Sequence, residues 1–86
     1  MKKWIKDRLG RLNKTFTFKN YRKSFAFVSE VALLAEKKNH HPEIILDYGK
    51  VTISLISHDI KKITERDLDL AKLIDKVYSS YLNEDK

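Results

Sequence analysis

The segment from residue 51 to residue 57 alternates apolar with polar side chains, and it constrains the fold more than any other part of the chain. Such alternation is the period of a β-strand with one buried face. The side chains on its apolar face are Val51, Ile53 and Leu55. Residues 14–19 alternate in the same way, and residues 43–48 favour a short strand before a turn at Gly49 and Lys50. The sequence therefore predicts three strands.

A segment with helical spacing follows Asn20, which is a suitable N-cap residue. Its apolar side chains recur every three or four residues, which predicts one helix face made of Tyr21, Phe25, Val28, Ala32 and Ala35. A second apolar stripe beside it contains Phe27, Val31 and Leu34. The apolar arc is wider than contact with one sheet requires, so it could also meet a second subunit. Pro42 disfavours the α conformation at His41, which predicts that the helix ends by there.

A second helix is predicted after Thr64, because Thr64 and Asp67 have the spacing of a capping box. Apolar residues then recur at helical spacing, and they are Leu70, Ile74, Val77 and Tyr81. The predicted order is strand, helix, strand, strand, helix. This order indicates a small α+β domain with helices packed on one face of an antiparallel sheet.

The chain of 86 residues is long enough for one domain, covering residues 1–86, and self-association would bury more apolar area. It has no cysteine, which excludes disulfides and thiolate chemistry. No apolar run approaches the length of a membrane span, and the basic N-terminus leads into no apolar signal region. A cytoplasmic protein without membrane contact is therefore expected.

Positive charge is concentrated near the N-terminus. Residues 1–23 hold nine Lys or Arg and one acidic residue, whereas the rest of the chain holds nine basic and eleven acidic residues. One interpretation is an anionic partner, such as nucleic acid or an acidic protein surface. The other is a solvated basic edge, which charge runs more often form. Nucleic-acid binding ranks last, because no motif of a nucleic-acid-binding fold is evident.

All three histidines, His40, His41 and His58, lie in the middle of the chain, and carboxylates accompany them. Histidine is the side chain whose ordinary pKa lies nearest neutrality, so it suits proton transfer. Glu36 precedes His40 by four residues, so the two would be neighbours if the helix continues that far. Asp67 falls in the first turn of the second predicted helix. The pattern predicts a proton-handling site.

Each of these residues also has an ordinary structural interpretation. Glu36 and His40 could be a surface pair, Asp67 could only cap its helix, and His58, which follows the strand in register, could be a loop residue. A metal site of Glu36, His40 and His58 is a weaker interpretation, because adjacent histidines do not easily chelate one ion from a regular backbone. Nucleophilic catalysis and a glycine-rich phosphate loop find no matching motif. Neither a metal ion nor a cofactor is expected.

The spacing of these residues resembles the signature of the pterin-4a-carbinolamine dehydratases. It comprises Glu36, His40-His41-Pro42, Tyr48, His58 and Asp67 at fixed intervals. Neighbouring segments are also similar, namely residues 16–19, 31–37 and 64–71. The resemblance covers the chain from Trp4 to about Val77. It implies a four-stranded antiparallel sheet with helices on one face, whose fourth strand would lie near residues 8–12, and assembly as a homodimer or homotetramer.

The resemblance also implies an activity. The family dehydrates 4a-hydroxytetrahydropterin to quinonoid dihydropterin, which recycles the cofactor of aromatic amino acid hydroxylases. His40 and His58 would act as general acids, and His41 would bind and orient the pterin. Glu36 would position His40, and Asp67 would support the histidines. Trp4 corresponds approximately to a tryptophan that lines the family's site, although its spacing to Phe16 is one residue short.

Two departures from the family pattern stand out. Many relatives carry a longer segment before the tryptophan, and Asn39 stands where some have an acidic residue. A different class of function is also open, since some family members are dimerisation cofactors for a transcription factor. On that alternative the chain would be a non-catalytic interaction module, and the wide apolar arc of the first helix would be its contact surface.

Overall fold

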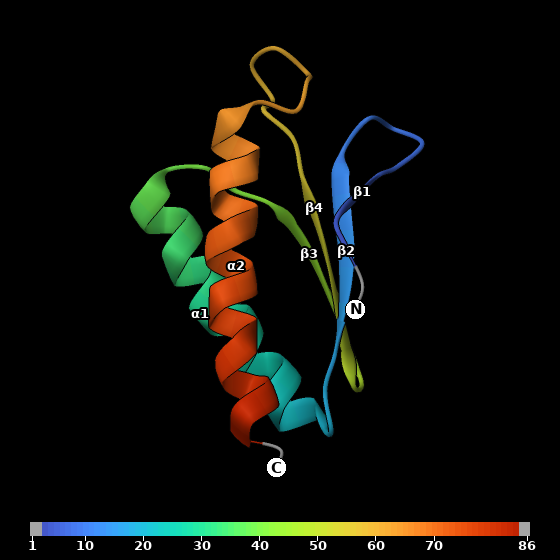
Figure 1. Cartoon of the computed structure of the whole chain (residues 1–86), viewed down its shortest axis with the longest axis vertical. Helices are drawn as coiled ribbons and strands as arrows, with labels where there is room; N and C mark the ends of the chain where they lie inside the picture. The colour runs from blue at the N-terminus through green and yellow to red at the C-terminus, as the bar shows by residue number, and fades with distance from the viewer. Residues whose placement is uncertain (1–2, 85–86) are drawn as a thin grey trace.

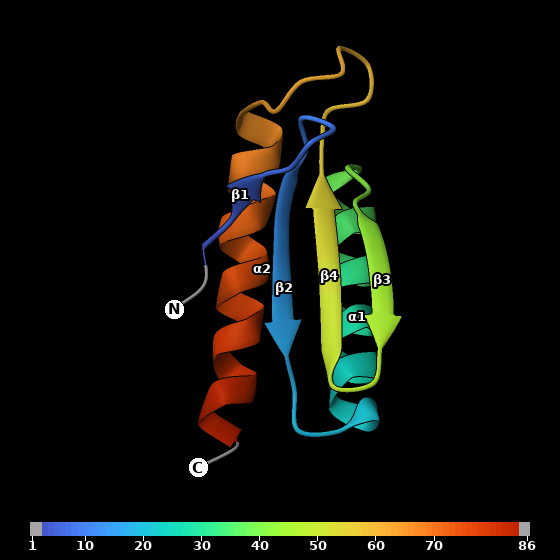
Figure 2. The ribbon, with the colours of Figure 1, turned by 90° about the vertical axis from the view of Figure 1, so that its right-hand side faces the viewer.

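The computed structural model describes residues 3–84, which form one antiparallel sheet with two helices packed against it (Figure 1). The strands are β1 (Ile5–Lys6), β2 (Leu12–Thr17), β3 (Glu43–Asp47) and β4 (Lys50–Leu55). Their order in the sheet is β1-β2-β4-β3, so β4 is central and β3 forms one edge (Figure 2). The helices are α1 (Tyr21–Lys38) and α2 (Glu65–Glu84). The α+β architecture predicted from the sequence is confirmed.

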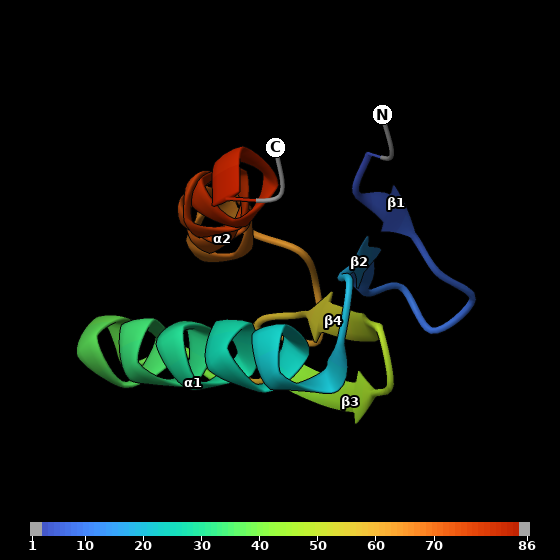
Figure 3. The same cartoon turned by 90° about the horizontal axis from the view of Figure 1, so that it is seen from below.

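Both helices lie on the same face of the sheet, as the view along the strands shows (Figure 3). The alternation in β4 places Val51, Ile53 and Leu55 against the helices, and all three are fully buried. Phe16 from β2 and Phe27 from α1 join this core, with ring centroids 5.0 Å apart. Burial of these side chains supplies the main favourable free energy of folding, at about 1.5–3 kcal/mol for each.

The helix ends follow local signals in the sequence. Asn20 caps α1, because its side-chain oxygen accepts a hydrogen bond from the backbone N–H of Lys23. Asn39 ends α1 in the left-handed conformation, with φ of 53°, which asparagine tolerates better than most residues. Thr64 and Asp67 form the predicted capping box at the start of α2, where the Asp67 carboxylate accepts from the Thr64 N–H at 2.8 Å.

Two details of the predicted elements were wrong. The fourth strand is Ile5–Lys6 rather than residues 8–12. The reason is a turn in which the Asp7 carboxylate accepts from the backbone N–H groups of Leu9 and Arg11, and Gly10 adopts a positive φ. The segment of residues 8–11, which was expected to form the fourth strand, lies in this turn, and β2 begins at Leu12.

The buried face of α1 also differs from the first stripe proposed. The fully or nearly fully buried residues are Ser24, Phe27, Val31 and Ala35. Tyr21 and Phe25 are exposed instead. Phe27 is preferred inside because it packs on the rings of both Phe16 and Tyr81. No helix within residues 3–84 is long and apolar enough to cross a membrane.

Candidate active site

His40 and Asp67 form a buried pair. His40 follows the end of α1 and Asp67 lies in the first turn of α2, and these two helix ends lie at the same end of the molecule (Figure 1). His40 Nε2 lies 2.6 Å from Asp67 Oδ1, and the two residues are only 8% and 0% exposed. The left-handed turn at Asn39 aims the chain inward, and the His40 N–H donates to the Ala35 carbonyl at 3.1 Å. The expected support of the histidines by Asp67 therefore has a direct geometric basis for His40.

The second carboxylate oxygen of Asp67 is held by two further donors. Ser57 Oγ and the Thr64 N–H both donate to Oδ2 at 2.8 Å. Ser57 Oγ also lies 2.7 Å from Thr64 Oγ1. Asp67 thus caps its helix and orients His40 at the same time, with one oxygen for each task.

These contacts determine the charge state of Asp67. Burial by itself raises the pKa of the Asp67 carboxyl, but hydrogen bonds from His40, the Thr64 N–H and Ser57 outweigh it, and the net result is a lowered pKa. The position in the first turn of α2 favours negative charge as well. Asp67 is therefore an ionised hydrogen-bond acceptor at neutral pH.

An ionised carboxylate can only accept, so His40 must donate from Nε2. Among the residues that the structure describes, Nδ1 has no protein partner, and no buried side-chain nitrogen or oxygen lacks one, so Nδ1 is reached by solvent. A cavity of about 140 Å³ lies beside this histidine. It is lined by Lys38, His40, Arg66, Asp69, Leu70 and Leu73. His40 therefore presents one free ring nitrogen that can give or take a proton.

The predicted Glu36–His40 pair was wrong. Glu36 Oε1 lies 2.5 Å from Nε2 of His41, the next histidine, and both side chains are largely exposed. The cause is again Asn39: α1 ends at Lys38, so His40 no longer follows Glu36 on the helix surface. Glu36 can orient His41, and it cannot position His40 in this conformation.

His58 lies in the loop between β4 and α2, because β4 stops at Leu55. It is exposed, and within residues 3–84 it takes part in no side-chain hydrogen bond or ion pair. The loop itself is fixed by a bridge between Ser57 and Lys62 and by an ion pair of 2.7 Å from Arg66 to Asp59. His58 therefore sits next to Ser57, which contacts Asp67.

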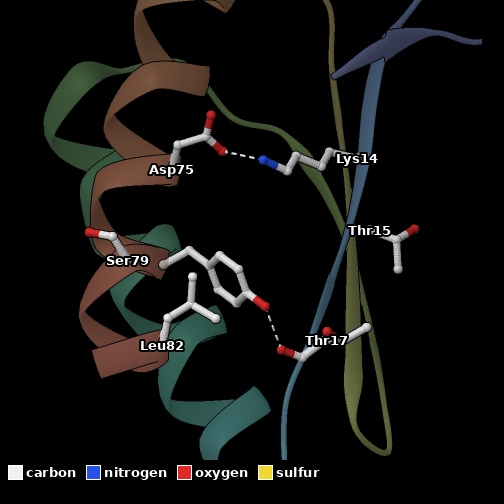
Figure 4. A pocket seen from close by; sticks show the side chains of 7 residues that line it. Lys14, Thr15, Thr17, Asp75, Ser79 and Leu82 are labelled. Atoms are coloured by element: carbon white, nitrogen blue, oxygen red, sulfur yellow. Dashed lines mark hydrogen bonds and ion pairs between the residues drawn. The ribbon is translucent and has the colours of Figure 1, made fainter. Parts of the chain in front are cut away.

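Trp4 belongs to a different part of the molecule from the histidines. Its indole N–H donates to both carboxylate oxygens of Asp75 at 3.1 Å, and its ring packs edge-on against Phe16. Asp75 also binds the Lys14 ammonium group at 2.8 Å, at the edge of a cavity of about 300 Å³ between β2 and α2 (Figure 4). None of the contacts of Trp4 within residues 3–84 involves a histidine, so its predicted place in the site rests on the family resemblance and stays a prediction.

Ser57 and Thr64 are the residues that the sequence analysis missed as parts of the site. Ser57 is fully buried, and it lies in the loop that holds His58. Its hydroxyl donates to Asp67, so it connects this loop to the carboxylate. The sequence shows only that Ser57 lies between an apolar strand and a capping box. This position does not by itself indicate a functional role. Within residues 3–84, no group of three or more His, Cys, Asp or Glu residues could hold a metal ion.

Comparison with known proteins defines the class to which this fold and site belong. Residues 1–77 match the family described as pterin 4 alpha carbinolamine dehydratase. The chain belongs to this family. A relative from Thermosynechococcus vestitus is 45% identical over 74% of this chain and 67% of its own length. One from Prochlorococcus marinus is 46% identical over 90% of this chain and 80% of its own. Both are named "Putative pterin-4-alpha-carbinolamine dehydratase".

Solved structures share the fold. A transcriptional coactivator/pterin dehydratase from Brucella melitensis is 33% identical with a TM-score of 0.82, over 87% of this chain and 81% of that one. A pterin dehydratase-like protein identified as a RuBisCO assembly factor in the alpha-carboxysome is 26% identical with a TM-score of 0.75, over 87% of this chain and 88% of that one. The same fold therefore occurs in proteins described by different functions.

Proposed function

We propose that this chain dehydrates 4a-hydroxytetrahydropterin to quinonoid dihydropterin, as a hydro-lyase that recycles a tetrahydropterin cofactor. The observation that carries the proposal is the His40 imidazole, which a buried carboxylate holds at Nε2 while Nδ1 stays accessible beside a cavity. Family membership supports the choice of substrate. Aromatic amino acid hydroxylases would supply the substrate.

The reaction needs proton transfer and no covalent intermediate. The C4a–oxygen bond breaks while a general acid protonates the hydroxyl, which leaves as water. The N5 proton is lost, and its electrons form the C4a–N5 double bond. An imidazolium at His40 can donate from Nδ1, because the Asp67 carboxylate stabilises the positive ring through Nε2.

The other histidines have supporting roles in this proposal. His58, on the adjacent loop, would serve as a second acid when a pterin brings the exposed imidazole toward the ring. His41, oriented by Glu36, would bind the pterin. A positioned acid or base contributes about 10²–10⁴-fold to a rate, so one or two such groups suffice for a reaction that already proceeds slowly in water.

The test is the rate of 4a-hydroxytetrahydropterin dehydration, followed by ultraviolet absorbance, for the wild type, His40→Ala, His41→Ala and a sample without protein. We expect His40→Ala to lose about 100-fold or to fall to background. His41→Ala should mainly raise KM. A wild-type rate equal to background would overturn the proposal, and equal losses in both variants would overturn the assignment of His40.

A non-catalytic interaction module is the second candidate, and the exposed apolar residues of α1 favour it. Tyr21 and Phe25 lie four residues apart on this helix, and both are about half exposed or more. A homodimer or homotetramer could bury them. Sedimentation of the wild type and of Phe25→Glu tests this: a dissociated variant supports the contact, and an unchanged mass contradicts it.

A further inference from the structure

The hydrogen bonds behind Asp67 all run in one direction. Ser57 gives its only hydroxyl proton to Asp67 Oδ2, so it must accept from Thr64 Oγ1 at 2.7 Å. Thr64 Oγ1 in turn accepts from the Arg66 N–H at 3.3 Å. Each donor in this relay points toward the carboxylate, and His40 Nε2 is the donor on its opposite oxygen.

The direction of the relay has a consequence for the His40 ring. A neutral imidazole can carry its proton on either nitrogen, and the tautomer is set by the partner of one of them. Asp67 fixes the proton on Nε2 only while it stays ionised and correctly oriented. Ser57 and Thr64 lie on the side of the carboxylate away from His40 and supply both conditions.

We propose that Ser57 is a positioning residue, which acts through Asp67 to hold His40 in the tautomer that leaves Nδ1 free. The hydroxyl of Ser57 is fully buried, so no water can replace it without rearrangement. Ser57 also precedes His58 directly, and its N–H donates to the Lys62 carbonyl at 3.0 Å. The same residue therefore ties the His58 loop to the carboxylate that holds His40.

The effect on catalysis rests on the proposed function, whereas the effect on the tautomer does not. The experiment is ¹⁵N NMR of the imidazole nitrogens above the titration range of histidine, combined with the dehydration rate. It compares the wild type with Ser57→Ala, Ser57→Thr and the matched control Ser24→Ala. Ser24 is also a fully buried serine, but its hydroxyl donates to the carbonyl of Asn20, the N-cap of α1, and makes no hydrogen bond with Asp67.

We expect the wild type, Ser57→Thr and Ser24→Ala to show the single tautomer with the proton on Nε2. Ser57→Ala should show both tautomers and a kcat about three- to tenfold lower at unchanged KM, as for the loss of a typical hydrogen bond. An unchanged tautomer in Ser57→Ala overturns the inference, and so does an equal change in Ser24→Ala, which would indicate general loosening. A wild type without activity would overturn the proposed function alone, because the tautomer still decides the role of Ser57.

Discussion

Asp67 and Asp75 lie eight residues apart on α2, about 12 Å along the helix, and they differ in what faces them. Asp67 is 0% exposed, and its partners are a histidine, a serine hydroxyl and a backbone N–H. Asp75 has a side chain 41% exposed, and its partners are the indole of Trp4 and the ammonium group of Lys14. The same residue type therefore serves two different purposes on one helix.

The difference lies in whether the partner can change its charge. The partner of Asp67 is an imidazole, a side chain whose ring nitrogens can give or take a proton, so the pair can take part in proton transfer. The partner of Asp75 is the Lys14 ammonium group, which also lies 4.9 Å from the Phe16 ring centroid. Asp75 therefore links Trp4 and β2 to α2, and we expect this contact to act on the stability of the fold.

The largest expected effect separates the two aspartates by activity. Asp67→Asn should lower kcat about 100-fold, because the amide cannot accept all three hydrogen bonds and no longer stabilises the imidazolium. Asp75→Asn should keep the rate within about twofold of the wild type. Dehydration kinetics at fixed pH measure both. Comparable losses in the two variants would mean that the Trp4 region does belong to the site.

The next effect separates them by stability. Asp75→Ala leaves the Lys14 side chain, which is only 11% exposed, without its carboxylate. We expect a loss of about 1–3 kcal/mol in the free energy of unfolding, measured by urea titration. Trp4 fluorescence should also shift, since the indole N–H loses its acceptor. Asp69→Ala, an exposed carboxylate on the same helix without a side-chain partner within residues 3–84, is the control and should cost less.

The pH dependence of stability should also distinguish Asp67. Its folded-state pKa lies below the ordinary value of 3.8, so the carboxylate stabilises the fold above that pH. This contribution is lost as the pH falls through the lowered value. The pKa of Asp7 is lowered by a hydrogen bond from the Arg11 N–H, and that of Asp59 by the Arg66 guanidinium. Both carboxylates therefore also lose stabilising charge as the pH falls. In Asp67→Asn the free energy of unfolding should fall less steeply below about pH 4 than in the wild type. Urea titrations at several pH values measure this, and identical pH dependence in the two proteins would contradict it.

The smallest effect is expected at the exposed pair. Glu36→Gln removes the charge beside His41, but both side chains face solvent, so stability should change by less than about 1 kcal/mol. If His41 binds the pterin, KM should rise about two- to threefold at unchanged kcat. A large fall in kcat would indicate that Glu36 acts on the reacting atoms.

Local patterns predicted most of the fold and part of the site. The period of residues 51–57 identified β4, and the capping box placed Asp67 in the first turn of α2. Contacts that depend on one backbone angle or on distant segments were not predictable. The partner of His40 changed because Asn39 has a positive φ, and Trp4 meets Asp75 across 71 residues of sequence. The burial of Ser57 likewise depends on how the loop between β4 and α2 folds, which the local sequence does not determine.

The left-handed conformation of Asn39 and the length of the connection after α1 together determine which histidine reaches the buried carboxylate. The connection turns the first histidine of the pair inward to Asp67 and leaves the second outside with Glu36. Deleting one residue between Lys38 and His40 would therefore bring His41 toward the buried carboxylate, with Pro42 directly behind it. Asn39→Gly, which keeps a residue that tolerates positive φ, should be tolerated far better than deletion of Asn39.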